Sequence, residues 1–379
     1  MTGQREKLIL SKEDVNNNNN NNNGTWSNSV PTFSDLPSCL LELILSFLLL
    51  KDNISASAVC KAWRTAAEYV RVVEKHPWVI YIPLCGTLID LFDPLPWKRY
   101  TLNLPEMDGS FVCYSKDGWL LMRRTNLVDL FFFNPYTREL ITLPKYNSQF
   151  QKIAFSSAPT SGTCVSVTLN FSLKYLLSIR ICYPGATEWI TMEFPFSLDF
   201  DPFRHSNLIY ANDHFFYFTG GILFEFDPAT RTLNHQAWDE YRRPHGRFFY
   251  LMEQKGELFL MYACGSVTPK VYKLSSSKWE EISSATFDGL TIFASRYSSV
   301  TRMDVLGLRN SVYLAKYGSY GMQCEFYSFR EGRLLKPLIV SQMLDEPNFV
   351  EGLWIEPPPC KDVLDFKLRK GKAKVTIAL

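Results

Sequence analysis

The chain has 379 residues, of which 46% are hydrophobic and 15% aromatic, and its 40 Lys and Arg against 38 Asp and Glu give a formal net charge of +2. The apolar content excludes wholesale disorder. The near-neutral balance removes the usual electrostatic argument for a partner that is nucleic acid or an anionic membrane, so we expect neither. The nine cysteines include no Cys-x-x-Cys pair, and no apolar signal segment opens the chain. We therefore expect an intracellular protein with reduced thiols, in the nucleus, the cytoplasm or both.

The first 30 residues are polar and contain an unbroken asparagine run at 16–23. Such a segment buries too little apolar area to offset the entropy that is lost on ordering it. The sequence therefore predicts a disordered leader over residues 1–30, with no activity of its own.

Residues 31–75 have the period of short helices. In the first helix the apolar positions recur at the three-to-four spacing of one helical face; they are Leu40, Leu41, Ile44, Leu45 and Leu48. Residues 54–70 read as two further short helices. Their predicted inward-facing residues are Ile54, Val59, Trp63, Ala67 and Val70. About forty residues make a very small core, and the first helix is apolar on most sides, so we expect this three-helix unit to dock on a partner.

From about residue 78 apolar and polar residues alternate, as they do in strands. Apolar runs at 128–133, 215–218 and 223–226 end at turns that contain Asn-Pro, Gly-Gly or Asp-Pro. Residues 364–379 alternate on both sides of a Lys-Gly-Lys turn, which predicts a hairpin that could complete the first or last repeat of the domain. No amphipathic helix is predicted between 80 and 340, so we expect residues 78–379 to be all-β.

A strand–turn–strand unit recurs six times along this domain. The copies cover residues 91–105, 131–144, 180–195, 224–238, 271–283 and 326–338. Their turn anchors lie 41, 49, 44, 47 and 55 residues apart and are Asp93, Asn134, Tyr183, Asp227, Leu274 and Phe329. Propeller blades repeat about every 40 to 50 residues, and a four-stranded blade buries its two faces only against neighbouring copies. The sequence therefore predicts a β-propeller of about six blades in preference to a large β-sandwich.

The sequence contains little catalytic chemistry. The five histidines have no metal-type spacing, and we interpret His205 and His214 as polar loop residues although Asp199, Asp201 and Asp213 are near them in the sequence. No P-loop, G-x-S-x-G or G-x-G-x-x-G motif occurs, and each cysteine reads as a small buried hydrophobe. We expect no catalytic residue, no metal and no cofactor, and hence a binding protein.

The helical segment resembles an F-box. That family has Leu-Pro, a helix with paired Leu and Ile-Leu, a polar break, and then Val-Cys-Lys-x-Trp-Arg. The corresponding residues here are Leu36, Pro37, Leu40, Leu41, Ile44, Leu45, Leu48, Asp52, Val59, Cys60, Lys61, Trp63 and Arg64. The remainder resembles the kelch-like propeller of a group of plant F-box proteins, the KIB type. The matching pieces are Asp-Gly-Trp-Leu-Leu at 117–121 and Asn-Pro-Tyr-Thr-Arg-Glu at 134–139, although the kelch Gly-Gly pair occurs only at 220–221.

These resemblances imply a substrate-recognition subunit of an SCF-type ubiquitin ligase. In that family the F-box binds a Skp adaptor, which links it to cullin and RING subunits, and the propeller holds the target protein. The residues that would form the adaptor-facing and core-forming set are Leu36, Pro37, Leu41, Ile44, Leu45, Leu48, Val59, Cys60 and Trp63. No residue would form a covalent intermediate, since holding the target near activated ubiquitin raises the effective concentration of its lysines.

Two other readings stay open at this point. An F-box protein can act outside a ligase, as an inhibitory or stable binding partner. A propeller enzyme of glycosidase type would need inward-facing carboxylates from several blades, and the sequence places no such pair. Candidate target-binding loops, chosen for exposed aromatic or basic residues, lie around 204–205, 241–247 and 317–320.

Overall fold

The computed structural model describes residues 36–46, 48, 56–70, 76–83, 86–94, 98–172, 176–196, 206–238, 248–264, 267–283, 287, 289–303, 305, 308–318, 321–341 and 350–356. The predicted leader over 1–30 and the predicted hairpin at 364–379 lie outside these residues. So do most of the candidate target-binding loops, at 204–205, 241–247 and 319–320.

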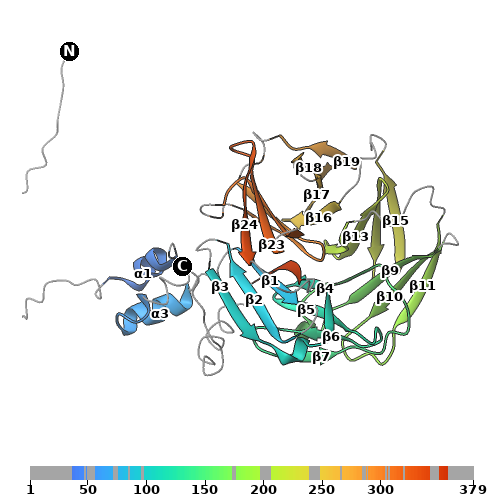
Figure 1. The fold of residues 1–379 in the computed structure, drawn as a ribbon, viewed down its shortest axis with the longest axis horizontal. Coiled ribbons are helices and arrows are strands. Elements are labelled where there is room, and N and C mark those ends of the chain that lie inside the picture. The colour runs from blue at the N-terminus through green and yellow to red at the C-terminus, as the bar shows by residue number, and fades with distance from the viewer. Residues whose placement is uncertain are drawn as a thin grey trace, which may run out of the picture.

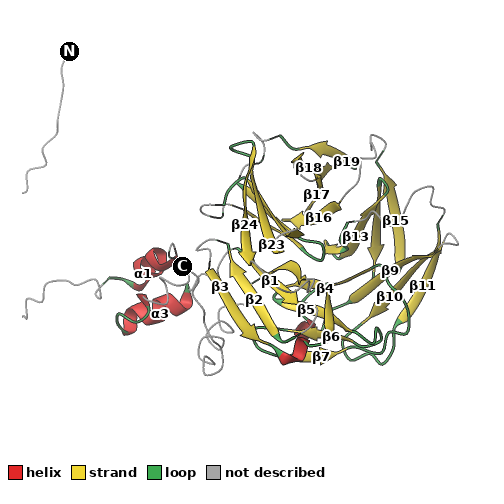
Figure 2. Cartoon of the chain, in the orientation of Figure 1, coloured by secondary structure: helices red, strands yellow, loops and turns green. Residues whose placement is uncertain are grey.

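Two helices form a unit of their own in the N-terminal part of the chain (Figure 2). Helix α1 covers Ser38–Ser46 and helix α3 covers Lys61–Tyr69. The prediction of three helices is confirmed for these two only. Its middle helix falls partly on residues 54–55, outside the described part, and beyond them the chain makes a turn in which the Val59 N–H donates to the Ala56 carbonyl at 3.1 Å.

Six sheets arranged in a ring follow, so the propeller and its six blades are confirmed (Figure 1). Blade 1 contains β1 (Trp78–Pro83), β2 (Leu88–Asp93), β3 (Lys98–Asn103) and β25 (Val350–Ile355). Blade 2 contains β4 (Ser110–Lys116), β5 (Trp119–Arg124), β6 (Leu130–Phe133) and β7 (Leu140–Thr142). Blade 3 contains β8 (Lys152–Phe155), β9 (Ser166–Ser172), β10 (Leu176–Cys182) and β11 (Ile190–Pro195).

Blade 4 contains β12 (Ile209–Ala211), β13 (His214–Thr219), β14 (Ile222–Asp227) and β15 (Thr232–Ala237). Blade 5 contains β16 (Phe248–Gln254), β17 (Glu257–Cys264), β18 (Val267–Ser275) and β19 (Lys278–Glu281). Blade 6 contains β20 (Leu290–Ala294), β21 (Ser299–Met303), β22 (Ser311–Gly318), β23 (Gly321–Ser328) and β24 (Arg333–Ser341). In the described part of the propeller the only helices are two 3₁₀ turns, Pro105–Met107 and Pro159–Ser161.

The six sequence repeats are the outermost hairpins of the six blades, with the last strand of each at the rim (Figure 1). Asp or Asn recurs in these turns because its side-chain oxygen accepts hydrogen bonds from backbone N–H groups of the turn. Oδ1 of Asn134 accepts hydrogen bonds from the N–H groups of Tyr136 and Thr137, at 2.9 and 3.2 Å. In the same way, Oδ1 of Asp227 accepts hydrogen bonds from the N–H groups of Ala229 and Thr230, at 2.8 and 3.3 Å. This side-chain turn is a local feature, which is why it is visible in the sequence.

Blade 6 departs from the predicted four-stranded pattern. Its order is β21-β20-β22-β23-β24, and β20 pairs with β22 in parallel while every other pair is antiparallel. Parallel neighbours cannot be joined by a tight turn, so the chain forms β21 before it returns to β22. The additional strand accounts for the longest spacing between repeats, 55 residues.

The ring is closed by strand β25, which pairs with β1 from Trp78 opposite Ile355 to Pro83 opposite Val350. The first and last described strands of the propeller therefore share one sheet. Such closure ties the two ends of the domain together, and the strand edges that remain in a propeller are short and protected.

Apolar side chains fill the spaces between neighbouring blades. Val79 and Tyr81 lie in one cluster with Phe293 of blade 6, whereas the intervening Ile80 lies in another with Phe133 of blade 2. Alternate residues of one strand thus bury opposite faces of a blade. Three more clusters join blades 2, 3 and 4, blades 4 and 5, and blades 5 and 6. Each fully buried residue of this size contributes about 1.5–3 kcal/mol.

Candidate functional site

The two-helix unit has a small apolar core of its own. Leu41 and Leu45 of α1 are 1% and 0% exposed and pack against Ala66 and Ala67 of α3. Alanine at both α3 positions lets the two helices approach closely. Around this core lie partly buried side chains, namely Leu36, Leu48, Ala56, Trp63 and Val70.

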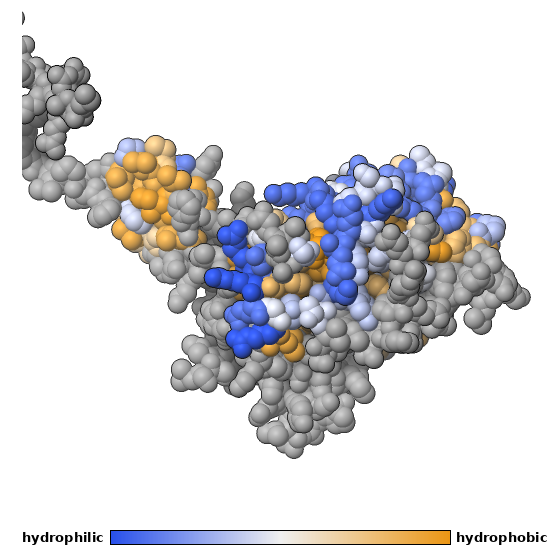
Figure 3. Space-filling view, turned by 90° about the horizontal axis from the view of Figure 1, so that it is seen from above, coloured by the Kyte–Doolittle hydropathy of each residue, from blue (hydrophilic) through white to orange (hydrophobic). Residues whose placement is uncertain are grey.

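Four large apolar side chains of the unit remain in solvent. Leu40, Leu43, Ile44 and Val59 are 45%, 54%, 42% and 63% exposed. Figure 3 shows hydrophobic residues gathered on this unit, in orange. Scattered exposed apolar residues are ordinary, but a group of them on so small a unit is typical of a surface that binds another protein. We call these four residues the apolar surface.

The structure separates the nine predicted adaptor-facing and core-forming residues into three groups. Leu41 and Leu45 are buried, Leu36, Leu48, Cys60 and Trp63 are partly buried, and Pro37, Ile44 and Val59 are exposed. The prediction that Val59 faces inward is wrong, because it lies in the turn before α3. Leu40 and Leu43 were missing from the predicted set. The helical period contains a signal for them, since residues 40, 43 and 44 share one face and residues 41, 45 and 48 another.

A second candidate site is a cavity of about 280 Å³ among the inner strands of the propeller. Its walls come from the ends of β4, β12 and β16, from β21, and from the residue after β25. We call it the axial pocket. Its charged lining residues comprise three carboxylates, Asp117, Glu253 and Glu356, and three cations, Lys116, Lys255 and Arg302. They come from four blades and are far apart in the chain, so no local motif could reveal the pocket.

Most of these charges already have partners. Nη2 of Arg302 lies 2.6 Å from Oε1 of Glu356. Oε1 of Glu253 accepts a hydrogen bond from the Gly256 N–H at 2.6 Å. The Lys116 ammonium donates to the Tyr210 carbonyl at 3.2 Å and lies over the Tyr210 ring, 5.2 Å from its centre.

Asp117 differs from these residues. It occupies the turn between β4 and β5 with a φ of 52°, and its carboxylate accepts a hydrogen bond from the backbone N–H of Ala158. The side chain is accessible to water in the pocket, yet the protein around the pocket displaces enough solvent to raise the pKa of the carboxyl. The nearby charge of Glu356 raises this pKa further, while Lys116 and Arg302 partly oppose the effect.

The glycosidase alternative required inward carboxylates from several blades, and the axial pocket contains three. Glu356 is paired with Arg302 and Glu253 accepts a hydrogen bond from a backbone amide, so two of the three carboxylates already have partners. Burial raises the pKa of the Cys164 and Cys182 thiols to about 11, which disfavours the nucleophilic thiolate at both positions.

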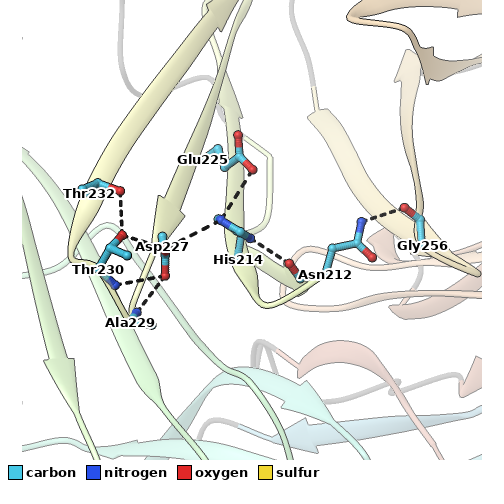
Figure 4. A network of polar contacts seen from close by, with 8 residues as sticks. All are labelled: Asn212, His214, Glu225, Asp227, Ala229, Thr230, Thr232 and Gly256. Atoms are coloured by element: carbon cyan, nitrogen blue, oxygen red, sulfur yellow. Dashed lines mark hydrogen bonds and ion pairs between the residues drawn. The ribbon is translucent and has the colours of Figure 1, made fainter.

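His214 belongs to a polar network on blade 4 (Figure 4). Its Nδ1 lies 2.7 Å from the Asn212 carbonyl oxygen, and its Nε2 lies 3.9 and 4.0 Å from the carboxylates of Glu225 and Asp227. Hydrogen bonds from Thr230 and Ala229 lower the pKa of Asp227, which holds the repeat turn. The network therefore organises turns, but His214 itself is the first residue of β13 and not the loop residue that was predicted. His205, Asp199 and Asp201 lie outside the described residues.

Among the described residues, no group of three or more His, Cys, Asp or Glu side chains is arranged to hold a metal ion. Within the same part of the chain, no helix has the length and apolar character needed to cross a membrane.

Comparison with known proteins yields two family matches. Residues 33–75 match the F-box domain, and residues 91–329 match the KIB1-4 beta-propeller. Three similar proteins of Arabidopsis thaliana illustrate the likeness. F-box protein At4g00893 is 44% identical, with 89% of each chain covered. F-box protein At3g56470 is 36% identical over 86% of this chain and 89% of its own. F-box/kelch-repeat protein At1g57790 is 36% identical over 86% of this chain and 95% of its own. Neither family description names an enzyme.

Proposed function

Because the chain belongs to the family of F-box proteins with a KIB1-4 β-propeller, we propose that it is the target-recognition subunit of an SCF-type ubiquitin ligase. In this proposal the two-helix unit binds a Skp-type adaptor, and through it the cullin and RING subunits. The propeller binds the target protein, in the nucleus or the cytoplasm.

The apolar surface is the observation that carries the adaptor half of the proposal. Leu40, Leu43, Ile44 and Val59 are exposed beside a core that consists of little more than two leucines and two alanines. Burying each large side chain against a partner gains about 1.5–3 kcal/mol, from which the cost of association must be subtracted. Four such residues are enough for specific docking. Polar residues around the edge of the interface would fix the orientation of the adaptor.

The role of the propeller in this proposal is proximity. The family membership supports a receptor, and the charged and polar groups on the described inner surface could contact a target. A target held by the propeller presents its lysines to activated ubiquitin at a raised effective concentration. The chain itself performs no bond-making step.

The test is co-purification of the full chain with a Skp-type adaptor and a cullin. An Ile44→Asp/Val59→Asp variant places two charges on the apolar surface without touching the core, and we expect it to lose the adaptor. The matched control is Leu88→Asp on β2, because Leu88 is 63% exposed, as Val59 is, but lies on the propeller. We expect this control to bind like the wild type.

The outcomes separate the proposal from its alternative. Capture of both adaptor and cullin supports the ligase role. Capture of the adaptor without cullin indicates an F-box protein that acts outside a ligase. If the folded wild type captures no adaptor, or if both variants bind equally well, the proposal is wrong.

A further inference from the structure

We infer that the axial pocket is a binding site for a cationic side chain, an arginine or lysine, presented by a segment of the target protein. The inference rests on the proposed function, since it names the chemistry by which the propeller would recognise a target. The axial pocket and the apolar surface lie in different parts of the chain, so this inference and the proposed adaptor binding can be tested and can fail separately.

The size of the pocket favours one side chain over a larger ligand. Its volume of about 280 Å³ lies at the small end of the range for ligand sites, about 300–1,000 Å³. The inner strands of most blades contribute to its walls, so a group inside it would be surrounded on several sides. Partial enclosure of this kind displaces some of the water that screens charges, which strengthens electrostatic contacts inside the pocket.

The distribution of unpaired charge favours a cation. Arg302 is engaged by Glu356, and Lys116 is engaged by the Tyr210 carbonyl and ring. Among the described residues Asp117 forms no ion pair, although it faces a pocket from which much of the bulk water is displaced. Lys255, in the turn after β16, also lines the pocket and forms none there, but its long flexible stem lets the ammonium turn out to solvent, whereas the short Asp117 side chain is held by the Ala158 N–H. The Asp117 carboxylate is thus an unpaired negative charge that a bound cation would neutralise.

Two hydroxyl groups give an independent indication of a polar ligand. Ser115 is 5% exposed, lines the pocket beside Asp117, and its Oγ is buried without a hydrogen-bond partner among the described residues. Ser299 of β21 also lines the pocket, and its Oγ is unpartnered in the same part of the chain. Buried polar groups are rarely left unpaired in proteins. A guanidinium or ammonium group supplies several donors and no acceptor, and a serine hydroxyl that rotates toward the pocket can accept from it.

The experiment uses ligand-detected NMR titration of the full chain with blocked five-residue peptides of Gly and Ser that carry one central residue. That residue is arginine, lysine or citrulline, the last being a neutral analogue of arginine with nearly the same shape. We expect the arginine or lysine peptide to bind saturably, and the citrulline peptide to bind at least tenfold more weakly. We also expect Asp117→Asn to weaken binding of the cationic peptide at least tenfold.

The matched control is Asp129→Asn, which removes a carboxylate from the turn between β5 and β6 of the same blade, outside the pocket. Asn tolerates the left-handed conformation of residue 117, and thermal unfolding verifies that both variants are folded. Equal binding of the arginine and citrulline peptides, unchanged binding by Asp117→Asn, or no binding of any peptide overturns the inference. Adaptor capture by the same Asp117→Asn protein shows whether the F-box function stands regardless.

Discussion

Gly352 of the closing strand lies directly opposite Tyr81 of β1, and the ring of Tyr81 covers it. A Cβ atom at Gly352 would lie 2.7 Å from Cε1 and 3.1 Å from Cδ1 of Tyr81. Real Cβ atoms essentially never lie within 3.0 Å of another heavy atom in this way, and Tyr81 is 1% exposed, so its ring has no open space into which to turn. Glycine is therefore required here by close approach to a cross-strand aromatic ring, which completes the core between blades 6 and 1.

We predict that Gly352→Ala destabilises the propeller by about 1–3 kcal/mol, the usual cost of overpacking a filled core. Denaturant unfolding followed by tryptophan fluorescence measures it. The Tyr81→Ala/Gly352→Ala double variant removes the clash, so it should be more stable than the sum of the two single effects indicates. A loss below about 0.5 kcal/mol for Gly352→Ala, which is typical of neutral substitutions, contradicts the prediction.

A second prediction concerns the entry of the chain into the propeller. Nε2 of His76 lies 2.7 Å from Oδ1 of Asp93, and both side chains are about 95% buried. Asp93 is also the anchor of the first repeat turn. His76→Ala removes a buried partner of this carboxylate, and we expect a loss of about 1–3 kcal/mol in the free energy of unfolding.

A double-mutant cycle of His76→Ala and Asp93→Ala isolates the contribution of that contact. If the two residues act together, the double variant is less destabilised than the two single variants combined. Strict additivity of the two losses would mean that the 2.7 Å contact contributes nothing measurable.

The propeller was predictable from sequence because its repeat is local. Asn134 and Asp227 accept hydrogen bonds from the N–H groups of residues two and three positions later, so the outer hairpins of blades 2 and 4 share one turn chemistry that the sequence displays. The fifth strand of blade 6 depends on the parallel pairing of β20 with β22, which leaves no local pattern. The closing strand lies at Val350–Ile355, and its pairing with β1 joins segments that are distant in the chain.

The candidate sites were only partly predictable, for a similar physical reason. Leu41 and Ile44 both satisfy the period of an apolar helix, and the position of Ala66 and Ala67 decides which of them is covered. The axial pocket is even harder to predict from sequence, since Asp117, Glu253 and Glu356 line one cavity only when the ring closes.

A third prediction follows from the buried thiols. Burial disfavours the charged thiolate and raises the pKa of Cys164 and Cys182 to about 11, so at pH 8 only about one molecule in a thousand carries the reactive form at either site. Iodoacetamide at pH 8 should therefore modify the exposed Cys39 and leave these two intact. Their modification should rise as the pH approaches 11.

Peptide mass spectrometry after timed alkylation gives the rate at each site. The same reaction in denaturant is the control, because unfolding restores an ordinary pKa of about 8.5 and all three thiols should react. Modification of Cys164 or Cys182 as fast as that of Cys39 in the folded protein at pH 8 contradicts the assignment.

The last prediction uses two neighbouring residues of α1 that have opposite environments. Leu45 is 0% exposed in the two-helix core, whereas Ile44 is 42% exposed on the apolar surface. Leu45→Ala leaves a cavity and should cost about 2–5 kcal/mol. So small a core has little stability to lose, and we expect amide exchange across residues 38–69 to accelerate strongly.

Ile44→Ala removes a side chain that already contacts water, so the expected stability change is within about 0.5 kcal/mol and amide exchange should stay as in the wild type. Its effect should be seen in adaptor affinity, which we expect to fall about tenfold, since a large apolar contact is then lost only in the complex. Leu45→Ala should weaken the adaptor only by unfolding the unit, so a stabilising osmolyte should partly restore its binding but leave the defect of Ile44→Ala unchanged. Equal amide exchange in the two variants would show that exposure does not separate core from contact residues in α1.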